Sequence, residues 1–324
     1  MRTLACLLTL SLALFALAEG TDGGSRARSI LARYLAAPHP DRPSKGDPYD
    51  PGADAEVNRA QQERLAILAE LKAMPRQAVA AADRVLFKQA NSKQRLEIVD
   101  ALGDYIHTRE CAELLHRVAQ DVRQPKDEKA ALYEELVRCS AVHGLRKMAR
   151  CTDRSGGKRI QHRPDFKPAV SGLVPYLVAA ANDKAERVRD SAVFALADTR
   201  DPAAVAELRN RLKDKSEKVR LYAACFLTEY QDASGLPEMR LALNRLREED
   251  SRGDFKDYFG HFMQLEMLLA SFERITGKSF GEIPLNPALA SIHDGSQIER
   301  YTELLDIWQA WWDWEPDGKQ EKNP

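Results

Sequence analysis

The sequence predicts an all-α protein, an α-solenoid in which antiparallel helical hairpins stack into a superhelix. Two observations lead to this fold class. The segment DKAERVR at 183–189 returns 31 positions later as DKSEKVR at 214–220, and a fixed period of a few tens of residues is typical of solenoids. Apolar residues also recur three and four positions apart from about residue 58 onward, as in amphipathic helices. No stretch alternates apolar and polar residues for long, so strands are not expected.

Each repeat unit holds two apolar-periodic stretches joined by a short charged turn. The stretches cover 174–181 and 188–196 in the first unit, and 205–212 and 219–227 in the second. The residues expected to face the core lie at matching positions of the two units: Leu177, Val188, Ala192, Leu196, Leu208, Val219, Ala223 and Leu227. A single hairpin cannot bury its own apolar face, so the units are expected to stack.

The turn between the two helices repeats with its flanks. Asp183 and Asp214 are placed to cap the second helix of each unit by accepting hydrogen bonds from its free amides. Val188-Arg189 and Val219-Arg220 follow five residues later, ahead of small residues. This pattern resembles the HEAT-repeat family in its short bacterial form of roughly 30 residues per repeat, over about residues 170–236. The resemblance implies a helical superhelix that binds other macromolecules, and it brings no invariant catalytic residue.

Residues 1–18 are interpreted as a cleaved signal peptide. Arg2 precedes an apolar run from Leu4 to Leu17, and the triplet Ala16-Leu17-Ala18 is an A-x-A cleavage site. A membrane anchor is the alternative, but the run is short for a bilayer. The expected protein is therefore exported, periplasmic or secreted, after cleavage behind Ala18.

Charge excludes one class of partner. Loss of Arg2 reduces the 48 Lys and Arg of the full chain by one against 49 Asp and Glu, so the mature net charge is −2. A near-neutral chain does not bind nucleic acid through its whole surface. No second apolar run approaches membrane length, so no span is expected in the mature chain.

Residues 19–57 are expected to be a proline-rich linker with one short helix at 26–37. Pro38, Pro40, Pro43, Pro48 and Pro51 interrupt regular structure after that helix. The segment is either a spacer that carries an interacting helix or an unstructured leader.

HEAT-like repeats are expected over 58–275. Helical periodicity covers 60–73, 77–89, 93–106 and 111–122, and then 129–137 and 144–148 as one further hairpin. The stretch from Arg95 to Asp104 resembles the second helix of the central units, about three periods earlier.

A basic insertion at 149–168 interrupts the array. From Ala141 through Pro168 there are eight Lys or Arg and two Asp, a local balance of +6, around Gly156-Gly157. Insertions in solenoids emerge as loops, often on the binding face. The candidate partner-binding residues are Arg150, Arg154, Lys158, Arg159 and Arg163, which suit an acidic partner. The alternative is a solvated loop.

The C-terminal part is expected to seal the solenoid. An apolar face from Phe255 to Phe272 precedes Gly277, which suits a left-handed position. Residues 276–314 form the predicted cap, and 315–324 form a tail. The cap consists of a loop and a Trp-rich helix from Ser296 to about Trp314, which includes Trp308, Trp311 and Trp312. The Ile-Thr-Gly segment with the later Trp-x-x-Trp-Trp resembles the closing segment of bacterial HEAT proteins. Alternatively, the tryptophans stack on envelope glycans.

The mature cysteines allow two further kinds of site. Cys139 could pair with Cys111 or Cys151 in a disulfide, or the thiols could pack free in helix interfaces. Cys139, His143, Cys151 and His162 could hold zinc, although they lack the short C-x-x-C spacing. We therefore expect neither a metal nor another cofactor.

A scaffold role follows from repeats without a catalytic motif. The chain has no G-x-S-x-G, H-E-x-x-H, G-x-G-x-x-G or C-x-x-C-H. We expect an exported, non-catalytic adaptor that binds another protein whose contact face is acidic. The alternatives are an enzyme or accessory subunit with a site near the basic insertion, similar to HEAT-type lyases, and an envelope glycan-binding module.

Overall fold

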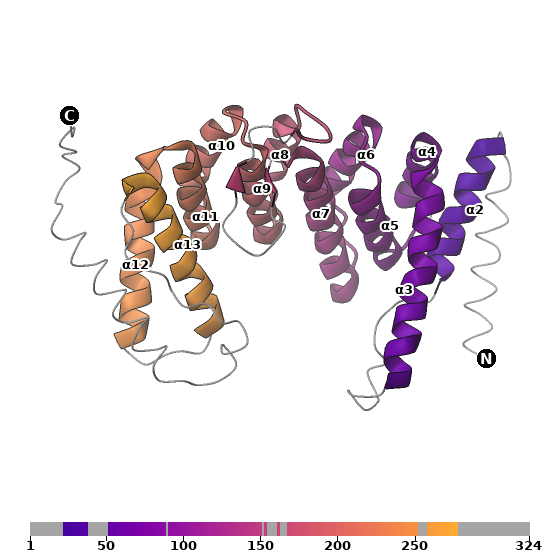
Figure 1. The fold of residues 1–324 in the computed structure, drawn as a ribbon, viewed down its shortest axis with the longest axis horizontal. Coiled ribbons are helices and arrows are strands. Elements are labelled where there is room, and N and C mark those ends of the chain that lie inside the picture. Colours follow the sequence, from indigo (N-terminus) through magenta and orange to yellow (C-terminus); the bar gives the residue numbers. More distant parts are fainter. Residues whose placement is uncertain are drawn as a thin grey trace. The chain divides into compact units, whose positions relative to one another are not determined.

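The computed structural model describes residues 22–37, 51–88, 90–150, 152–153, 161–162, 167–251 and 258–277. Within these ranges the chain is almost entirely helical (Figure 1). It divides into two compact units, residues 1–199 (unit 1) and 200–324 (unit 2). Among the described residues, no helix is long and apolar enough to cross a membrane.

Unit 1 is a double row of helices. α4, α6 and α8 contact one another in sequence along one row, and α5, α7 and α9 along the other (Figure 1). α2 and α3 extend the rows by contacting α4 and α5 respectively. The helices of unit 1 are α2 (Asp22–Ala36), α3 (Pro51–Lys72), α4 (Pro75–Lys88), α5 (Ser92–Tyr105), α6 (Arg109–Gln120), α7 (Glu128–Ala149), α8 (Val174–Ala180) and α9 (Glu186–Thr199). Stacked hairpins of this kind form an α-solenoid.

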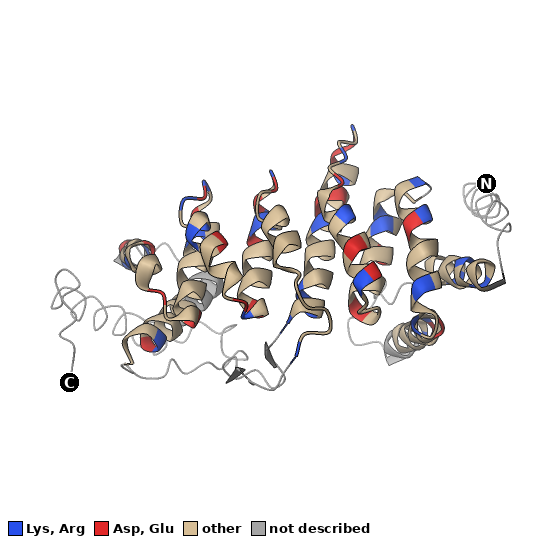
Figure 2. Cartoon of the chain, turned by 90° about the horizontal axis from the view of Figure 1, so that it is seen from above, with Lys and Arg blue, Asp and Glu red and all other residues tan. Residues whose placement is uncertain are grey.

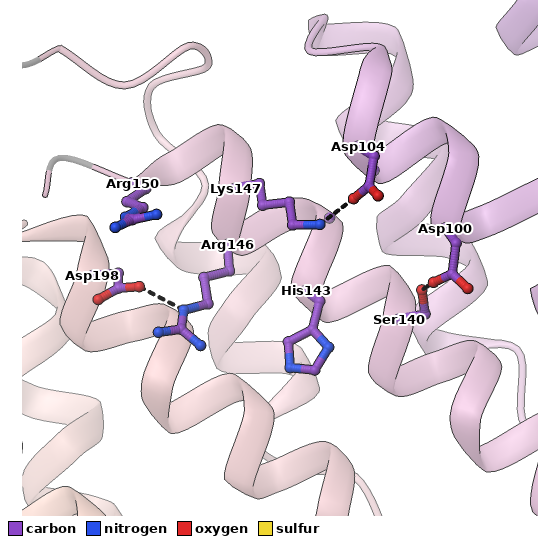
Figure 3. Close-up of a pocket in the computed structure, with 10 residues that line it drawn as sticks. Asp100, Asp104, Ser140, His143, Arg146, Lys147, Arg150 and Asp198 are labelled. Carbon is purple, nitrogen blue, oxygen red and sulfur yellow. Dashed lines mark hydrogen bonds and ion pairs between the residues drawn. The ribbon is translucent and has the colours of Figure 1, made fainter. Parts of the chain in front are cut away.

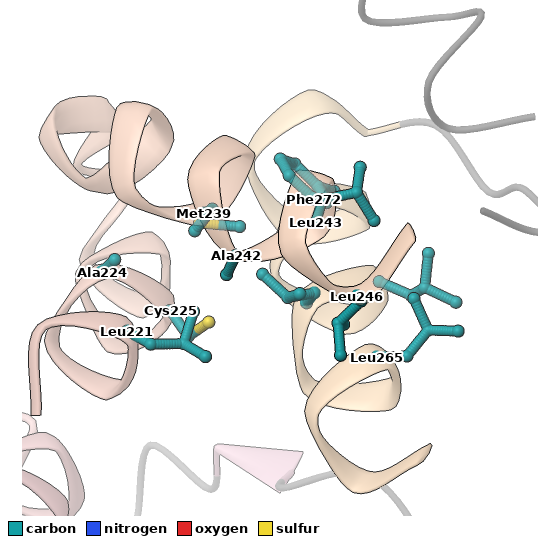
Figure 4. Close-up of a cluster of buried hydrophobic side chains, with 11 residues drawn as sticks. Leu221, Ala224, Cys225, Met239, Ala242, Leu243, Leu246, Leu265 and Phe272 are labelled. Carbon is teal, nitrogen blue, oxygen red and sulfur yellow. The ribbon is translucent and has the colours of Figure 1, made fainter. Parts of the chain in front are cut away.

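Unit 2 continues the hairpin pattern and has its own core. Its helices are α10 (Ala203–Arg211), α11 (Glu217–Leu227), the 3₁₀ turns η1 (Thr228–Tyr230) and η2 (Ala233–Gly235), α12 (Leu236–Ser251) and α13 (Tyr258–Thr276). Leu243 of α12 and Phe272 of α13 belong to a buried cluster with Cys225 of α11 (Figure 4). Gly277 ends α13 in the predicted left-handed conformation, with φ +70°.

The predicted repeat register is confirmed. The eight residues expected to face the core in 177–227 are all fully buried. The repeat also extends to the backbone, because Arg200 after α9 and Gln231 after α11 are 31 positions apart and both have positive φ, 54° and 57°. Single left-handed residues of this kind end helices where a carbonyl must be satisfied.

Three expectations differ from the structure. α7 is one helix of 22 residues where two short helices were expected. The short helix expected at 26–37 is present as α2, with Ile30 and Leu31 buried, but the linker expected to reach residue 57 ends earlier, because α3 begins at Pro51. Proline is favoured at the first helical position, where its missing N–H costs no bond, so Pro51 starts a helix. The basic insertion contains a two-residue antiparallel strand pair, with Thr152 opposite His162.

Candidate binding site

A polar pocket opens on the α5–α7–α9 row of unit 1 (Figure 3). Its volume is about 350 Å³, within the usual range for pockets that bind small groups. The pocket is lined by Asp100, Gly103 and Asp104 of α5, by Ser140, His143, Gly144, Arg146 and Lys147 of α7, by Arg150, and by Asp198 of α9.

Two glycines let α5 and α7 approach each other closely at the pocket. A Cβ atom on Gly144 would lie 2.9 Å from the Cα of Gly103 and 2.6 Å from Cδ1 of Leu115. Real Cβ atoms do not approach other atoms so closely, so these positions require glycine at this helix separation. Both glycines line the pocket.

Arg146 is held by α9. Its Nε donates to Oδ2 of Asp198 at 2.5 Å, and the Asp198 side chain is 2% exposed. The guanidinium carbon lies 5.3 Å from the centre of the Phe194 ring, a cation–π contact. These two contacts fix the plane of the guanidinium and leave the Nη edge without a hydrogen bond to any described residue.

The α5 wall carries two carboxylates one helical turn apart. Asp104 is paired with Lys147 of α7, and Asp100 accepts a hydrogen bond from the Ser140 hydroxyl (Figure 3). Burial raises the pKa of Asp100, against the lowering effect of the Ser140 hydrogen bond, and the negative charge of Asp104 raises it further. Asp100 is therefore harder to ionise than a free aspartate.

His143 lies between these two walls. Partial burial lowers the pKa of His143, and the positive charges of Arg146 and Lys147 lower it further. Asp190 opposes this effect. The neutral imidazole is favoured, and it both donates and accepts one hydrogen bond.

The predicted basic insertion starts at this pocket. Arg150 directly follows α7 and lines the pocket together with Arg146. Arg154, Lys158, Arg159 and Arg163 lie outside the described residues. The predicted C-terminal cap with Trp308, Trp311 and Trp312 also lies outside them, as do the signal peptide and the tail.

The repeat residues hold the turns rather than a binding surface. Asp183 accepts from the N–H of Ala185 at 2.7 Å, and Arg189 donates to the carbonyl oxygen of Asp183 at 3.1 Å. Asp214 and Arg220 make the equivalent bonds in unit 2. Val188 and Val219 are buried. Each repeat thus ties its second helix to its own turn.

The predicted cap role of the two aspartates is wrong in its position. The N-cap of α11 is Ser216, whose hydroxyl accepts from the N–H of Val219 at 3.4 Å. Asp214 accepts from Ser216 itself, at 2.8 Å. A short Asp side chain reaches the amide two residues ahead, so it closes the turn before the helix starts.

The described thiols are free and buried. Cys111, Cys139 and Cys225 form no disulfide, and burial raises the pKa of their thiols to about 12, 11 and 12 respectively. Within the described residues, no group of three or more His, Cys, Asp and Glu side chains is placed to hold a metal ion. Cys139 is buried while His143 is open to solvent.

Sequence reasoning missed the pocket, although a signal was present. Arg95, Arg138 and Arg189 are buried at the same position of successive second helices. The residues nine positions after them are Asp104, Lys147 and Asp198, all in the pocket. Their charges alternate in sign along the row: negative on α5, positive on α7 and negative on α9. This alternation indicates contacts between neighbouring helices, but it is visible in the sequence only after the three helices have been aligned on their buried arginines.

The comparison with protein families agrees with the repeat pattern over part of the chain. A family model described as HEAT repeats matches residues 172–253. Among solved structures, the Escherichia coli protein YibA is 14% identical, with 89% of this chain and 98% of YibA covered and a TM-score of 0.29. Human deoxyhypusine hydroxylase in complex with glycerol is 16% identical, with 89% and 97% covered and a TM-score of 0.25. No curated protein matches the chain in sequence.

Proposed function

We propose, starting from the premise that residues 172–253 of this chain are HEAT repeats, that it is an exported, non-catalytic adaptor for another protein. HEAT repeats point to a protein-interaction scaffold, because stacked helices present an extended surface built from many repeats. The partner contacts the α5–α7–α9 row and the basic insertion, which meet at Arg150. Its contact face carries acidic residues that complement the insertion.

One observation carries this proposal: basic residues are concentrated at the end of α7 and in the insertion that follows it. Arg146, Lys147 and Arg150 line the pocket, and the sequence from Ala141 through Pro168 holds eight Lys or Arg against two Asp. Elsewhere on the described helices, Lys and Arg are interspersed with Asp and Glu (Figure 2). Mixed charges cancel beyond a Debye length at physiological salt, whereas a cluster of one sign attracts an acidic partner.

Replacement of Arg154, Lys158, Arg159 and Arg163 by Ser should weaken partner capture and reduce its salt dependence. The melting temperature should stay nearly unchanged, since exposed charges contribute little to folding. Capture is measured by pull-down from an envelope extract at several salt concentrations. As a control, Arg59, Lys72, Arg84 and Lys93, all exposed on α3, α4 and α5, are changed to Gln, which removes the same charge. Equal capture by the two variants would place the binding surface outside the insertion.

Export is part of the proposal and rests on residues 1–18. Arg2, the apolar run and the A-x-A triplet support a cleaved signal. The mature protein recovered from cells should begin at Glu19, which mass spectrometry of its N-terminal peptide measures. A peptide that still contains residues 1–18 would contradict export by cleavage.

A further inference from the structure

We infer that the pocket between α5, α7 and α9 binds a dipolar group of a protein chain, with its cation at Asp100 and its carboxylate at Arg146. This inference deepens the proposed function, because it states which chemistry the partner brings to the α5–α7–α9 row. The group is either a C-terminal lysine or arginine residue, or an internal pair of a basic and an acidic side chain. Both sources present the same two charges side by side.

The acidic side of the pocket has one cation too few. Glu97, Asp100 and Asp104 lie on one face of α5, three and four residues apart. Arg64 of α3 pairs with Glu97 at 3.0 Å, and Lys147 of α7 pairs with Asp104. Asp100 lies between them and makes no ion pair with any described residue. Of these three carboxylates on α5, Asp100 is therefore the one that can pair with a cation from a ligand.

The basic side has a donor that is fixed in position but not saturated. Asp198 holds Nε of Arg146 and Phe194 supports the plane of the guanidinium, so the Nη edge is oriented before any ligand arrives. A guanidinium edge binds a carboxylate through two parallel hydrogen bonds. Because the side chain is already ordered, binding costs less conformational entropy.

The two sides face the same space. In Figure 3 the α5 carboxylates lie on one side of the pocket and Arg146, Arg150 and Asp198 on the other, with Lys147 and His143 between them. A ligand with a single charge would pair with only one of the two groups, either Asp100 or the Nη edge of Arg146. A dipolar ligand satisfies both walls together. A bound cation would also relieve the repulsion that Asp104 and Glu97 exert on Asp100.

The test uses defined peptides and calorimetric titration of the full mature chain. The dipolar probes are acetyl-Gly-Gly-Lys with a free C-terminus, and an end-blocked helical peptide with one internal Lys-Glu pair. The single-charge probes are the amidated form of the first peptide and its Nζ-acetylated form. At least one dipolar probe should bind, and which of the two does so identifies the source. Each single-charge probe should bind about tenfold more weakly, since each lost ion pair costs about one factor of ten.

Variants assign the two charges to their residues. Asp100→Asn should weaken binding of the dipolar probe about tenfold and leave binding of the Nζ-acetylated probe, which carries only the carboxylate, unchanged. Arg146→Lys should also weaken binding of the dipolar probe, because it removes the paired N–H donors of the guanidinium. The matched controls are Glu113→Gln on α6 and Arg84→Gln on α4, both exposed, and they should bind as the parent chain. Equal binding of all probes, no saturable binding, or unchanged binding by Asp100→Asn would overturn the inference. Partner capture that persists in any of these cases would leave the proposed function standing.

Discussion

Val188→Asp and Val219→Asp should each lower the free energy of unfolding by about 3 kcal/mol or more. Both valines are fully buried at the same position of successive repeats. An ionised carboxylate there has no partner and loses its hydration, which is among the costliest single changes in a core. Denaturant unfolding followed by far-ultraviolet circular dichroism measures the effect.

A matched control separates burial from charge. Ala206 lies on α10 and is exposed, so Ala206→Asp should cost only the difference in helix propensity, about 0.5 to 0.7 kcal/mol. Wild-type stability in both valine variants would show that the repeat register, and with it the assignment of core positions, is wrong.

Arg95→Met should destabilise unit 1 by about 3–5 kcal/mol, the usual cost of removing one partner of a buried ion pair. The Arg95 side chain is fully buried. It donates to the Leu86 carbonyl oxygen at 3.2 Å, and it pairs with Asp121 at 2.9 Å and with Glu134 at 3.5 Å. Glu134 is 3% exposed, so it would be left as a buried charge without its cation.

Removing both charges should recover much of that loss. In Arg95→Met/Glu134→Gln no unpaired ion remains inside, and the neutral amide can still accept from the Ser92 hydroxyl that bonds Glu134 at 2.6 Å. Arg84→Met, at an exposed position of α4, controls for the loss of an arginine. Thermal unfolding of the parent chain, Arg95→Met, Glu134→Gln and the double variant forms a double-mutant cycle. A double variant no more stable than Arg95→Met would contradict this account of the pair.

The local repeat was predictable because helix and turn follow from short-range patterns. The spacing of apolar residues identified α8 to α11 and the core positions from Leu177 to Leu227. It failed at α7, where the stretch from Gly144 to Met148 was expected to be the second helix of a hairpin. There the glycine allows a close approach to Gly103 of α5 instead, and a contact between helices leaves no trace in the local pattern.

Of the residues that line the candidate site, only Arg150 was predicted from the sequence. Arg150 was identified by charge density along the chain, and it lies at the pocket. Asp100 and Asp198 stand almost a hundred residues apart and were missed, because only stacking of α5, α7 and α9 brings them to one pocket. Asp183 was predicted to cap the following helix, but its side chain accepts from the N–H of Ala185 and closes an Asx turn before that helix. The two roles are hard to separate in a sequence, because both use the same residue type.

The central claim is that a protein partner binds the α5–α7–α9 row. Photo-crosslinking from the pocket tests this claim most directly. A photoreactive phenylalanine analogue replaces His143, which is open to solvent at the pocket, or Glu113, which is exposed on α6 in the other row. After irradiation of cells that produce each chain, we expect one discrete crosslinked product from position 143 and none from position 113. No product from position 143, or equal products from both positions, would contradict the claim.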